Sequence, residues 1–159
     1  MDTSSAHRIR PARSDDLEAI IELEAQAFEP ARRSSRASLR RALRSPSQRV
    51  LVLEAAGGEG SGRVAGYLVV WPFRRTWRIY NLASDPARRN QGVGGALLAA
   101  AAAEARRAGA ARLVLEARLE PGLVRFYEQR GFRTCRTLPN YYAEGEDAIR
   151  MEQALPPVP

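Results

Sequence analysis

The spacing of hydrophobic and polar residues changes several times along the chain, and its first part predicts a short strand followed by helices. A strand is expected near His7–Pro11. Leu17, Ile20, Ile21 and Phe28 then recur at helical spacing, which puts them on one face of a helix.

Polar residues mark the starts of two helices in this part. Asp15, with Glu18 three residues on, is typical of a capping pair for the first helix. Ser35 is the expected cap of the second, whose apolar positions are Leu39, Ala42 and Leu43.

Three apolar segments between residues 49 and 84 predict neighbouring strands. "RVLVLEA" reads as a buried strand closed by the turn "GGEGSG". "RVAGYLVVWPF" and "TWRIYNLAS" follow, with only Arg74–Arg75 between them. Links this short predict an antiparallel meander.

The pattern changes after Pro86. Helix formers run over residues 92–108 and stop at Gly109, before the strand "ARLVLEAR". Residues 77–118 therefore predict a strand–helix–strand unit with parallel strands.

The remaining residues predict one more helix and two strands. The helix spans residues 122–130 and ends at Gly131. "FRTCRTL" and "AIRMEQAL" are the strands, with the polar loop "PNYYAEGED" between them. We expect one domain over residues 1–159, with loose tails at 1–6 and 156–159.

Composition excludes several classes of protein. No window approaches the roughly 20 apolar residues of a membrane span, and the first residues lack the apolar core of a signal peptide. We therefore expect a cytoplasmic protein with no membrane partner. Cys135 is the single cysteine, which excludes an internal disulfide and a cysteine-built metal site, and we expect it to fill a small place in the core.

The positive charge comes entirely from arginine. All 25 basic residues are arginines, and the net charge is +7. The absence of lysine excludes lysine-nucleophile chemistry, whereas the charge favours anions such as a phosphate-bearing cofactor or RNA. Arg33, Arg36, Arg40 and Arg44 share one face of the second predicted helix, either as a solvated surface or as a face for RNA or the ribosome.

The run "RRNQGVGG", residues 88–95, has the composition of a phosphate-binding loop. A P-loop would end in Gly-Lys-Ser/Thr, but Gly94 is followed by Gly95 and Ala96. The glycines are also too crowded for a dinucleotide fingerprint, and several strands precede them. A scheme Arg/Gln-x-x-Gly-x-Gly between strand and helix does fit, because small residues let backbone N–H groups approach a pyrophosphate. A glycine-rich turn with no ligand is the alternative.

Several motifs in order resemble the GNAT superfamily of acetyl-CoA-dependent N-acetyltransferases. "IYNLASDP", "RRNQGVGG", "LVLEAR", "FYEQRGF" and "NYYAEGEDAIRM" carry the resemblance, which runs from about Arg8 to Leu155. The last motifs resemble the RimI-like branch, which acetylates the N-terminal amine of a ribosomal protein.

This resemblance implies an α/β (α+β) fold of the GNAT type. The expected sheet is mixed, strongly twisted and six- to seven-stranded, is flanked by about four helices, and splays into a V between the central parallel strands. Coenzyme A would enter that V, and no metal is expected.

The resemblance also implies cofactor-binding residues. Backbone groups at Leu82, Ala83 and Ser84 would hold the pantetheine arm and polarise the thioester carbonyl. The pyrophosphate would be held by a second set of residues, with Arg88 as a further source of charge: Arg89, Asn90, Gln91, Gly92, Val93, Gly94 and Gly95.

Two residues match the family's proton-transfer positions. Glu116 lies where RimI-like enzymes carry a base, and strand alternation points it away from Leu115 and Ala117. Its alternative role is a salt bridge to Arg112 or Arg118. Tyr127 matches the usual acid, and its alternative role is packing beside Phe126.

The sequence says less about the acetyl acceptor than about the acetyl donor. Tyr141 and Tyr142 are expected to line an acceptor groove, with Glu144, Glu146 and Asp147 receiving a cationic amine; a hairpin with solvated acids is the alternative. An N-terminal α-amine, with a pKa of about 7.7–8.0 against about 10.4 for lysine, is partly free base near neutral pH. A protein or peptide N-terminus is thus the expected acceptor, bound by a monomer or homodimer.

Two departures from the RimI-like pattern keep other acceptors open. The segment "EARLEPGLVRFY" has Glu120 or Pro121 where the family places an asparagine that contacts the cofactor. "AFEPARRSS" lacks the family's Pro-Trp, in a region that helps to shape the acceptor site. A small-molecule amine acceptor and a coenzyme A sensor without activity are the alternatives.

Overall fold

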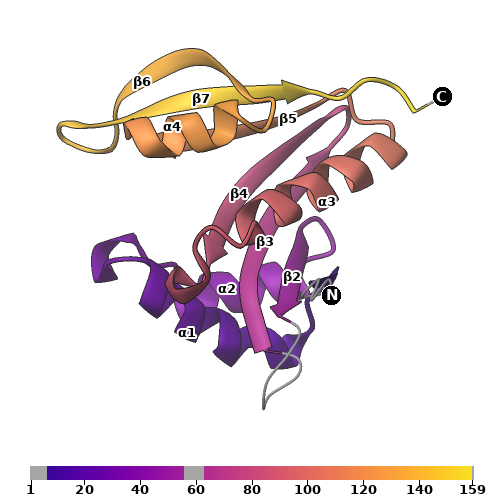
Figure 1. Cartoon of the computed structure of the whole chain (residues 1–159), viewed down its shortest axis with the longest axis vertical. Coiled ribbons are helices and arrows are strands. Elements are labelled where there is room, and N and C mark those ends of the chain that lie inside the picture. The colour runs from indigo at the N-terminus through magenta and orange to yellow at the C-terminus, as the bar shows by residue number, and fades with distance from the viewer. Residues whose placement is uncertain (1–6, 56–62, 159) are drawn as a thin grey trace, which may run out of the picture. The chain divides into compact units, whose positions relative to one another are not determined.

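The computed structural model describes residues 7–55 and 63–158, which contain seven strands and four α-helices (Figure 1). The strands are hydrogen-bonded in the order β1-β2-β3-β4-β5-β7-β6. The predicted mixed sheet of six to seven strands is confirmed. The chain divides into two compact units, Met1–Trp71 with Asn81–Ala101, and Pro72–Tyr80 with Ala102–Pro159.

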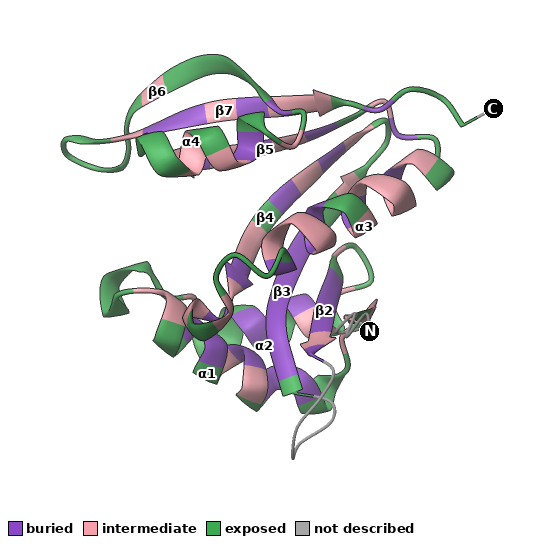
Figure 2. Cartoon of the chain, viewed as in Figure 1, coloured by how far each residue is buried: buried purple, intermediate pink, exposed green. Residues whose placement is uncertain are grey.

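The first unit is built on antiparallel strands and two helices. β1 (Arg8–Pro11), β2 (Arg49–Ala55) and β3 (Arg63–Phe73) pair antiparallel in sequence order. α1 (Leu17–Ala27) and α2 (Arg36–Arg44) contribute the predicted apolar faces to one core with β2 and β3. Figure 2 shows β3 buried along most of its length, as its continuous apolar sequence requires.

Helix α2 begins as predicted. The Ser35 side chain accepts a hydrogen bond from the Ser38 backbone N–H at 3.1 Å. Leu39 and Ala42 are buried, and Arg36, Arg40, Arg41 and Arg44 are exposed.

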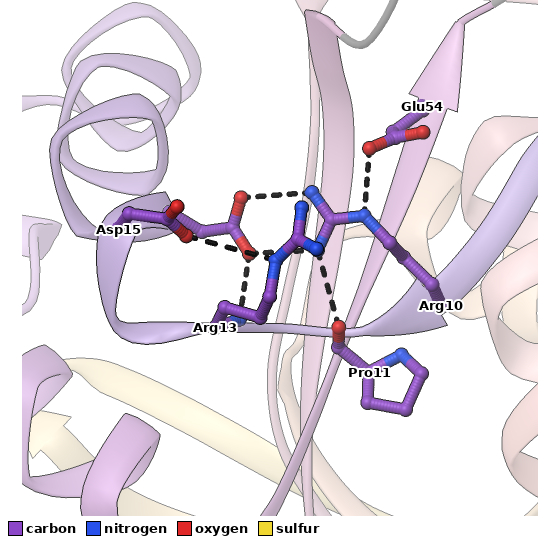
Figure 3. Close-up of polar contacts among 6 residues, drawn as sticks. Arg10, Pro11, Arg13, Asp15 and Glu54 are labelled. Atoms are coloured by element: carbon purple, nitrogen blue, oxygen red, sulfur yellow. Dashed lines mark hydrogen bonds and ion pairs between the residues drawn. The ribbon is translucent and has the colours of Figure 1, made fainter.

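The predicted Asp15–Glu18 capping pair is wrong. A 3-10 turn (Ser14–Asp16) precedes α1, and Asp16 closes it by accepting from the Arg13 backbone N–H at 2.7 Å. Asp15 is exposed and lies 3.7 Å from Arg13 Nε (Figure 3). The sequence pattern of a capping pair cannot tell which of two adjacent aspartates turns inward. That choice depends on which side chain becomes buried, and here it is Asp16.

Asp16 turns inward because Arg10 meets it. Two parallel hydrogen bonds of 2.8 and 2.9 Å join the Arg10 guanidinium to the Asp16 carboxylate, and Arg10 Nε also donates to Glu54 at 2.6 Å (Figure 3). This hydrogen bonding lowers the pKa of Asp16 and raises that of Arg10. The three side chains are mostly buried and join β1, β2 and the start of α1.

β4 (Thr76–Ser84) and α3 (Val93–Arg107) belong partly to each unit. Within the first unit, the start of α3 packs tightly on Gly66 of β3. A Cβ at Gly66 would lie 2.5 Å from Val93 Cγ1 and 3.1 Å from the Ala83 carbonyl oxygen. Gly66 therefore lets the helix that follows the glycine-rich loop come close to the strands.

The second unit contains β5 (Arg112–Arg118), α4 (Pro121–Glu128), β6 (Arg133–Ala143) and β7 (Glu146–Ala154). β5 pairs parallel to β4 over three residue pairs, Thr76↔Arg112 to Arg78↔Val114, which confirms the predicted parallel strands. β7 pairs antiparallel with β5 and with β6. Gly109 and Gly131 adopt φ values of +84° and +89° after α3 and α4, as expected of glycines that end helices.

Two expectations for this unit are wrong. The loop predicted at residues 139–147 is mostly strand, because Asn140 at φ +52° forms an irregularity in β6 and its side chain accepts from the Gly145 N–H at 2.7 Å. Cys135 is exposed rather than in the core, because a register shift between Thr134 and Arg136 leaves it out of the pairing.

The predicted turn "GGEGSG" and tail 1–6 lie outside the described residues.

Candidate active site

The end of β4 and the start of α3 hold the residues expected to bind the cofactor. Ala83 is buried, and Leu82 and Ser84 are partly exposed. The next residue, Asp85, is buried and donates its backbone N–H to the Ala65 carbonyl at 2.8 Å. This hydrogen bond joins the end of β4 to β3.

The glycine-rich loop presents backbone N–H groups at a helix start. Its turn uses left-handed backbone at Asn90 (φ +68°) and Gly92 (φ +75°). The first helical hydrogen bond of α3 runs from the Ala96 N–H to the Gly92 carbonyl. The N–H groups of Val93, Gly94 and Gly95 come before it and have no helical acceptor, which is the arrangement that binds anions.

Arginines flank this loop unequally. Arg88 Nε lies 3.9 Å from the buried carboxylate of Asp85, which also accepts from the Ala87 N–H. Arg89 is exposed. His7 Nε2 lies 3.3 Å from the Gln91 carbonyl oxygen. The donor set suits a pyrophosphate, since phosphate oxygens accept from both N–H groups and guanidinium.

Glu116 lies in the second unit and is held by two arginines. Its Oε1 accepts from Arg150 Nη2 at 2.9 Å and Nε at 3.1 Å, and its Oε2 lies 2.6 Å from Arg78 Nη2. Its side chain is only 5% exposed. The predicted alternation is confirmed, because Leu115 and Ala117 are buried on the opposite face. The alternative partners predicted, Arg112 and Arg118, are wrong; they pair with Glu152 and Glu146.

Tyr127 lies on α4 in an aromatic cluster. Its ring packs edge-on against Phe126 and Phe132, with ring centres 5.1 and 5.6 Å apart. Burial, with a smaller contribution from Tyr142, raises the pKa of Tyr127 to about 12. The phenol is therefore protonated throughout the neutral range, as a proton donor must be.

Tyr141 and Tyr142 come together at the end of β6, beside Glu116. Their rings lie edge to face, 5.0 Å apart, and both are exposed. The Tyr142 hydroxyl donates to the Glu116 backbone carbonyl at 3.4 Å, and Arg78 donates to the Tyr141 hydroxyl at 3.3 Å. The Arg118 guanidinium stacks 4.2 Å from the centre of the Tyr142 ring.

Two of the three acids expected to receive a cationic amine have other partners, and the third, Glu144, is exposed. Glu146 pairs with Arg118 at 2.9 Å. Asp147 accepts from the Asn140 N–H at 3.0 Å and so stabilises the hairpin. Glu120 is exposed and precedes α4, without a capping hydrogen bond from its side chain.

Sequence reasoning missed the residues that reach the candidate site from distant strands. Arg78 and Arg150 both bind Glu116, from β4 and β7.

A second polar network lies in the first unit. The buried Glu24 accepts from Ser34 and Tyr67. Asn81, one residue before Leu82, donates to the Tyr67 hydroxyl at 3.2 Å. Glu24 could have been noticed in the sequence, because it is a charged residue on the apolar face of the first predicted helix.

Metal-binding side-chain groups and membrane-spanning helices were sought in the part of the chain that the structure describes. No group of three or more His, Cys, Asp or Glu side chains there could hold a metal ion. Every helix in residues 7–55 and 63–158 is too short or too polar to cross a bilayer.

Comparisons with known proteins show the family of the chain. The profile of the Acetyltransferase (GNAT) family matches residues 17–132. A Bacillus subtilis protein named "Putative ribosomal protein bS18-alanine N-acetyltransferase" is 30% identical over 146 residues, which cover 90% of this chain and 92% of that protein.

Two solved structures share the fold over nearly their whole length. The ribosomal-protein-S18-alanine N-acetyltransferase from Escherichia coli superposes with a TM-score of 0.83 at 25% identity, covering 97% of each chain. Ard1 from Thermoplasma volcanium superposes with a TM-score of 0.82 at 27% identity, covering 95% of this chain and 99% of that one. The predicted resemblance to the RimI-like branch is confirmed. The chain belongs to the acetyltransferase (GNAT) family and is an N-acetyltransferase.

Proposed function

We propose that this enzyme transfers the acetyl group of acetyl-CoA to the N-terminal α-amine of a protein or peptide. The observation that carries the proposal is the helix start at Val93–Gly95, whose backbone N–H groups follow a left-handed turn at Gly92. The acceptor class is supported by the Escherichia coli and Bacillus subtilis relatives, whose names state an alanine of ribosomal protein S18.

The residues proposed for the acetyl donor all lie in the first unit. Backbone N–H groups from Asn90 to Gly95 would bind the pyrophosphate, with Arg89 and, more weakly, Arg88 adding charge. Backbone groups at Leu82, Ala83 and Ser84 would hold the pantetheine arm. An N–H near Leu82–Ala83 would stabilise the negative charge that develops on the thioester oxygen.

The proposed proton transfers use two residues of the second unit. The free-base amine attacks the thioester carbon, a C–N bond forms, the C–S bond breaks, and the thiolate leaves. Tyr127 supplies a proton to that sulfur. Glu116 takes the proton from the amine through a bridging water, which would donate to Oε2, because that oxygen contacts one arginine and keeps a second acceptor site.

A thiol-release assay with acetyl-CoA tests the transfer. Short peptides with free N-termini should be acetylated, the same peptides with blocked N-termini should not, and lysine side chains should react far more slowly. A small-molecule amine is the second candidate acceptor, favoured by the missing Pro-Trp in "AFEPARRSS". Turnover of small amines with none of any peptide would replace the peptide proposal with it.

Two variants test the proposed roles separately. Gly92→Val should abolish coenzyme A binding in calorimetry, because it strains the left-handed turn and blocks the N–H groups. Gly109→Val is the matched control, since Gly109 has a similar φ of +84° but lies after α3, and it should still bind. Tyr127→Phe should lower kcat by about 10²-fold or more while coenzyme A affinity stays within about 2-fold. Unchanged kcat would remove Tyr127 as the acid.

A further inference from the structure

A row of charged residues crosses the strands of the second unit at Glu116. Glu116 on β5 lies opposite Arg150 on β7, and Arg150 lies opposite Arg136 on β6. Residues opposite one another on paired strands point to the same face of the sheet. Arg78 reaches Glu116 from β4 on the other side.

Positive charge exceeds negative charge in this row. One carboxylate, Glu116, faces Arg78 and Arg150, whose side chains are each 37% exposed. Arg136 is exposed beside Arg150, and like charges on directly opposed residues are destabilising. The register shift between Thr134 and Arg136 places Arg136, and not Cys135, opposite Arg150.

The same face carries further arginines on either side of the row. Toward one end, Arg112 and Arg133 share the single carboxylate of Glu152, at 3.7 and 3.5 Å. Toward the other end, Arg118 pairs with Glu146 and stacks on Tyr142. The six arginines of this face therefore meet three glutamates.

This surplus lies beside the residues proposed to act on the acceptor. Tyr141 and Tyr142 flank Glu116, and Arg78 contacts both Glu116 and the Tyr141 hydroxyl. A cationic acceptor would be repelled there. A peptide carboxylate would be attracted, since arginine binds carboxylates through paired hydrogen bonds.

We propose that the exposed face of β5, β7 and β6 selects peptide acceptors with aspartate or glutamate shortly after the acetylated residue, and that Arg136 and Arg150 bind those carboxylates. This inference rests on the proposed transfer to a peptide N-terminus. An acidic peptide fits better than RNA, because the arginines adjoin Glu116, where the acceptor's amine must end.

Peptides with one N-terminal residue and varied charge at positions two to four test the inference. The kcat/KM for acidic peptides should exceed that for their amide counterparts (Asn, Gln) by about 10-fold, mainly through KM, and cationic peptides should be poorest. Raising the salt concentration should shrink the difference.

Arg136→Glu is the sharpest variant, because Arg136 contacts neither Glu116 nor any residue proposed to act in catalysis. It should remove or reverse the preference for acidic peptides and leave kcat/KM for neutral peptides within about 2-fold. Arg40→Glu, an exposed arginine of α2 in the first unit, is the matched control and should keep the preference.

The outcomes separate the two proposals. Peptide acetylation without a charge preference, or a preference that Arg136→Glu leaves unchanged, overturns this inference alone. No acetylation of any peptide overturns the proposed function and this inference with it. Inhibition of peptide turnover by an RNA oligonucleotide, relieved by Arg136→Glu, with no preference among the peptides, would assign the face to RNA instead.

Discussion

Two ion-pair clusters of opposite composition lie in the two units of the molecule. In the first unit, one guanidinium, Arg10, serves the two carboxylates of Asp16 and Glu54 (Figure 3). In the second, one carboxylate, Glu116, serves the two guanidiniums of Arg78 and Arg150. Both central residues are mostly buried, but their partners differ in exposure.

The outer partners of the first cluster are mostly buried, whereas those of the cluster proposed to act on the substrate are partly exposed. Asp16 and Glu54 have side chains 8% and 15% exposed, so their negative charges are compensated within the protein by Arg10. Arg78 and Arg150 are each 37% exposed, so they can reach solvent or a substrate. A cluster whose surplus charge faces outward can serve recognition, whereas one closed on all sides contributes to folding.

Removal of Arg10 should have the largest effect on stability. Arg10→Met leaves two buried carboxylates without their partner, and it should lower the free energy of unfolding by about 3–5 kcal/mol. Urea unfolding at pH 7 measures this change. The preference for acidic peptides should survive in the folded fraction; loss of that preference would contradict the division of roles.

Replacement of Glu116 should affect turnover more than stability. Glu116→Gln removes the proposed base, and kcat should fall by about 10²-fold. Solvent can hydrate the two partly exposed arginines, so the loss of stability should be smaller than that of Arg10→Met. Turnover and unfolding are to be measured on the same preparation. Unchanged turnover with a large loss of stability would make Glu116 a structural residue like Asp16.

The Arg10 cluster should also weaken in acid. Hydrogen bonding to Arg10 lowers the folded-state pKa of Asp16 below its usual value near 3.8. The resulting stability is fully present above about pH 5 and is lost as the pH falls through the folded pKa. Asp16→Asn should cost about 1.5–3 kcal/mol at pH 7, and the difference from wild type should shrink by pH 2–3. A constant difference across this range would show that its charge does not matter.

The smallest effect is expected for an ion pair outside both clusters. Glu18 and Arg36 lie 2.5 Å apart on α1 and α2, but both side chains are at least half exposed. Water and salt screen such a pair. Glu18→Gln should therefore leave the melting temperature unchanged in calorimetry, and a clear decrease would show that contact distance outweighs burial here.

Local patterns in the sequence were sufficient for most elements. β3 and β4 begin and end where their apolar runs do, and Ser35 caps α2, because strand periodicity and capping depend on near neighbours. The end of the chain was harder to predict. The polar run after Leu138 is typical of a loop, yet its backbone pairs with β7 around the irregularity at Asn140.

The residues of the candidate site also differ in whether the sequence alone could predict them. The glycine-rich loop and the motifs around Glu116 and Tyr127 are contiguous in sequence, so the sequence by itself determined the enzyme family. The partners of Glu116, the inward turn of Asp16 and the close approach of α3 to Gly66 were decided only by the tertiary structure. Glu116 and Arg150 are 34 positions apart and meet only when β5 and β7 have paired. Arg10 and Asp16 are only six positions apart, but which aspartate turns toward Arg10 is decided by burial.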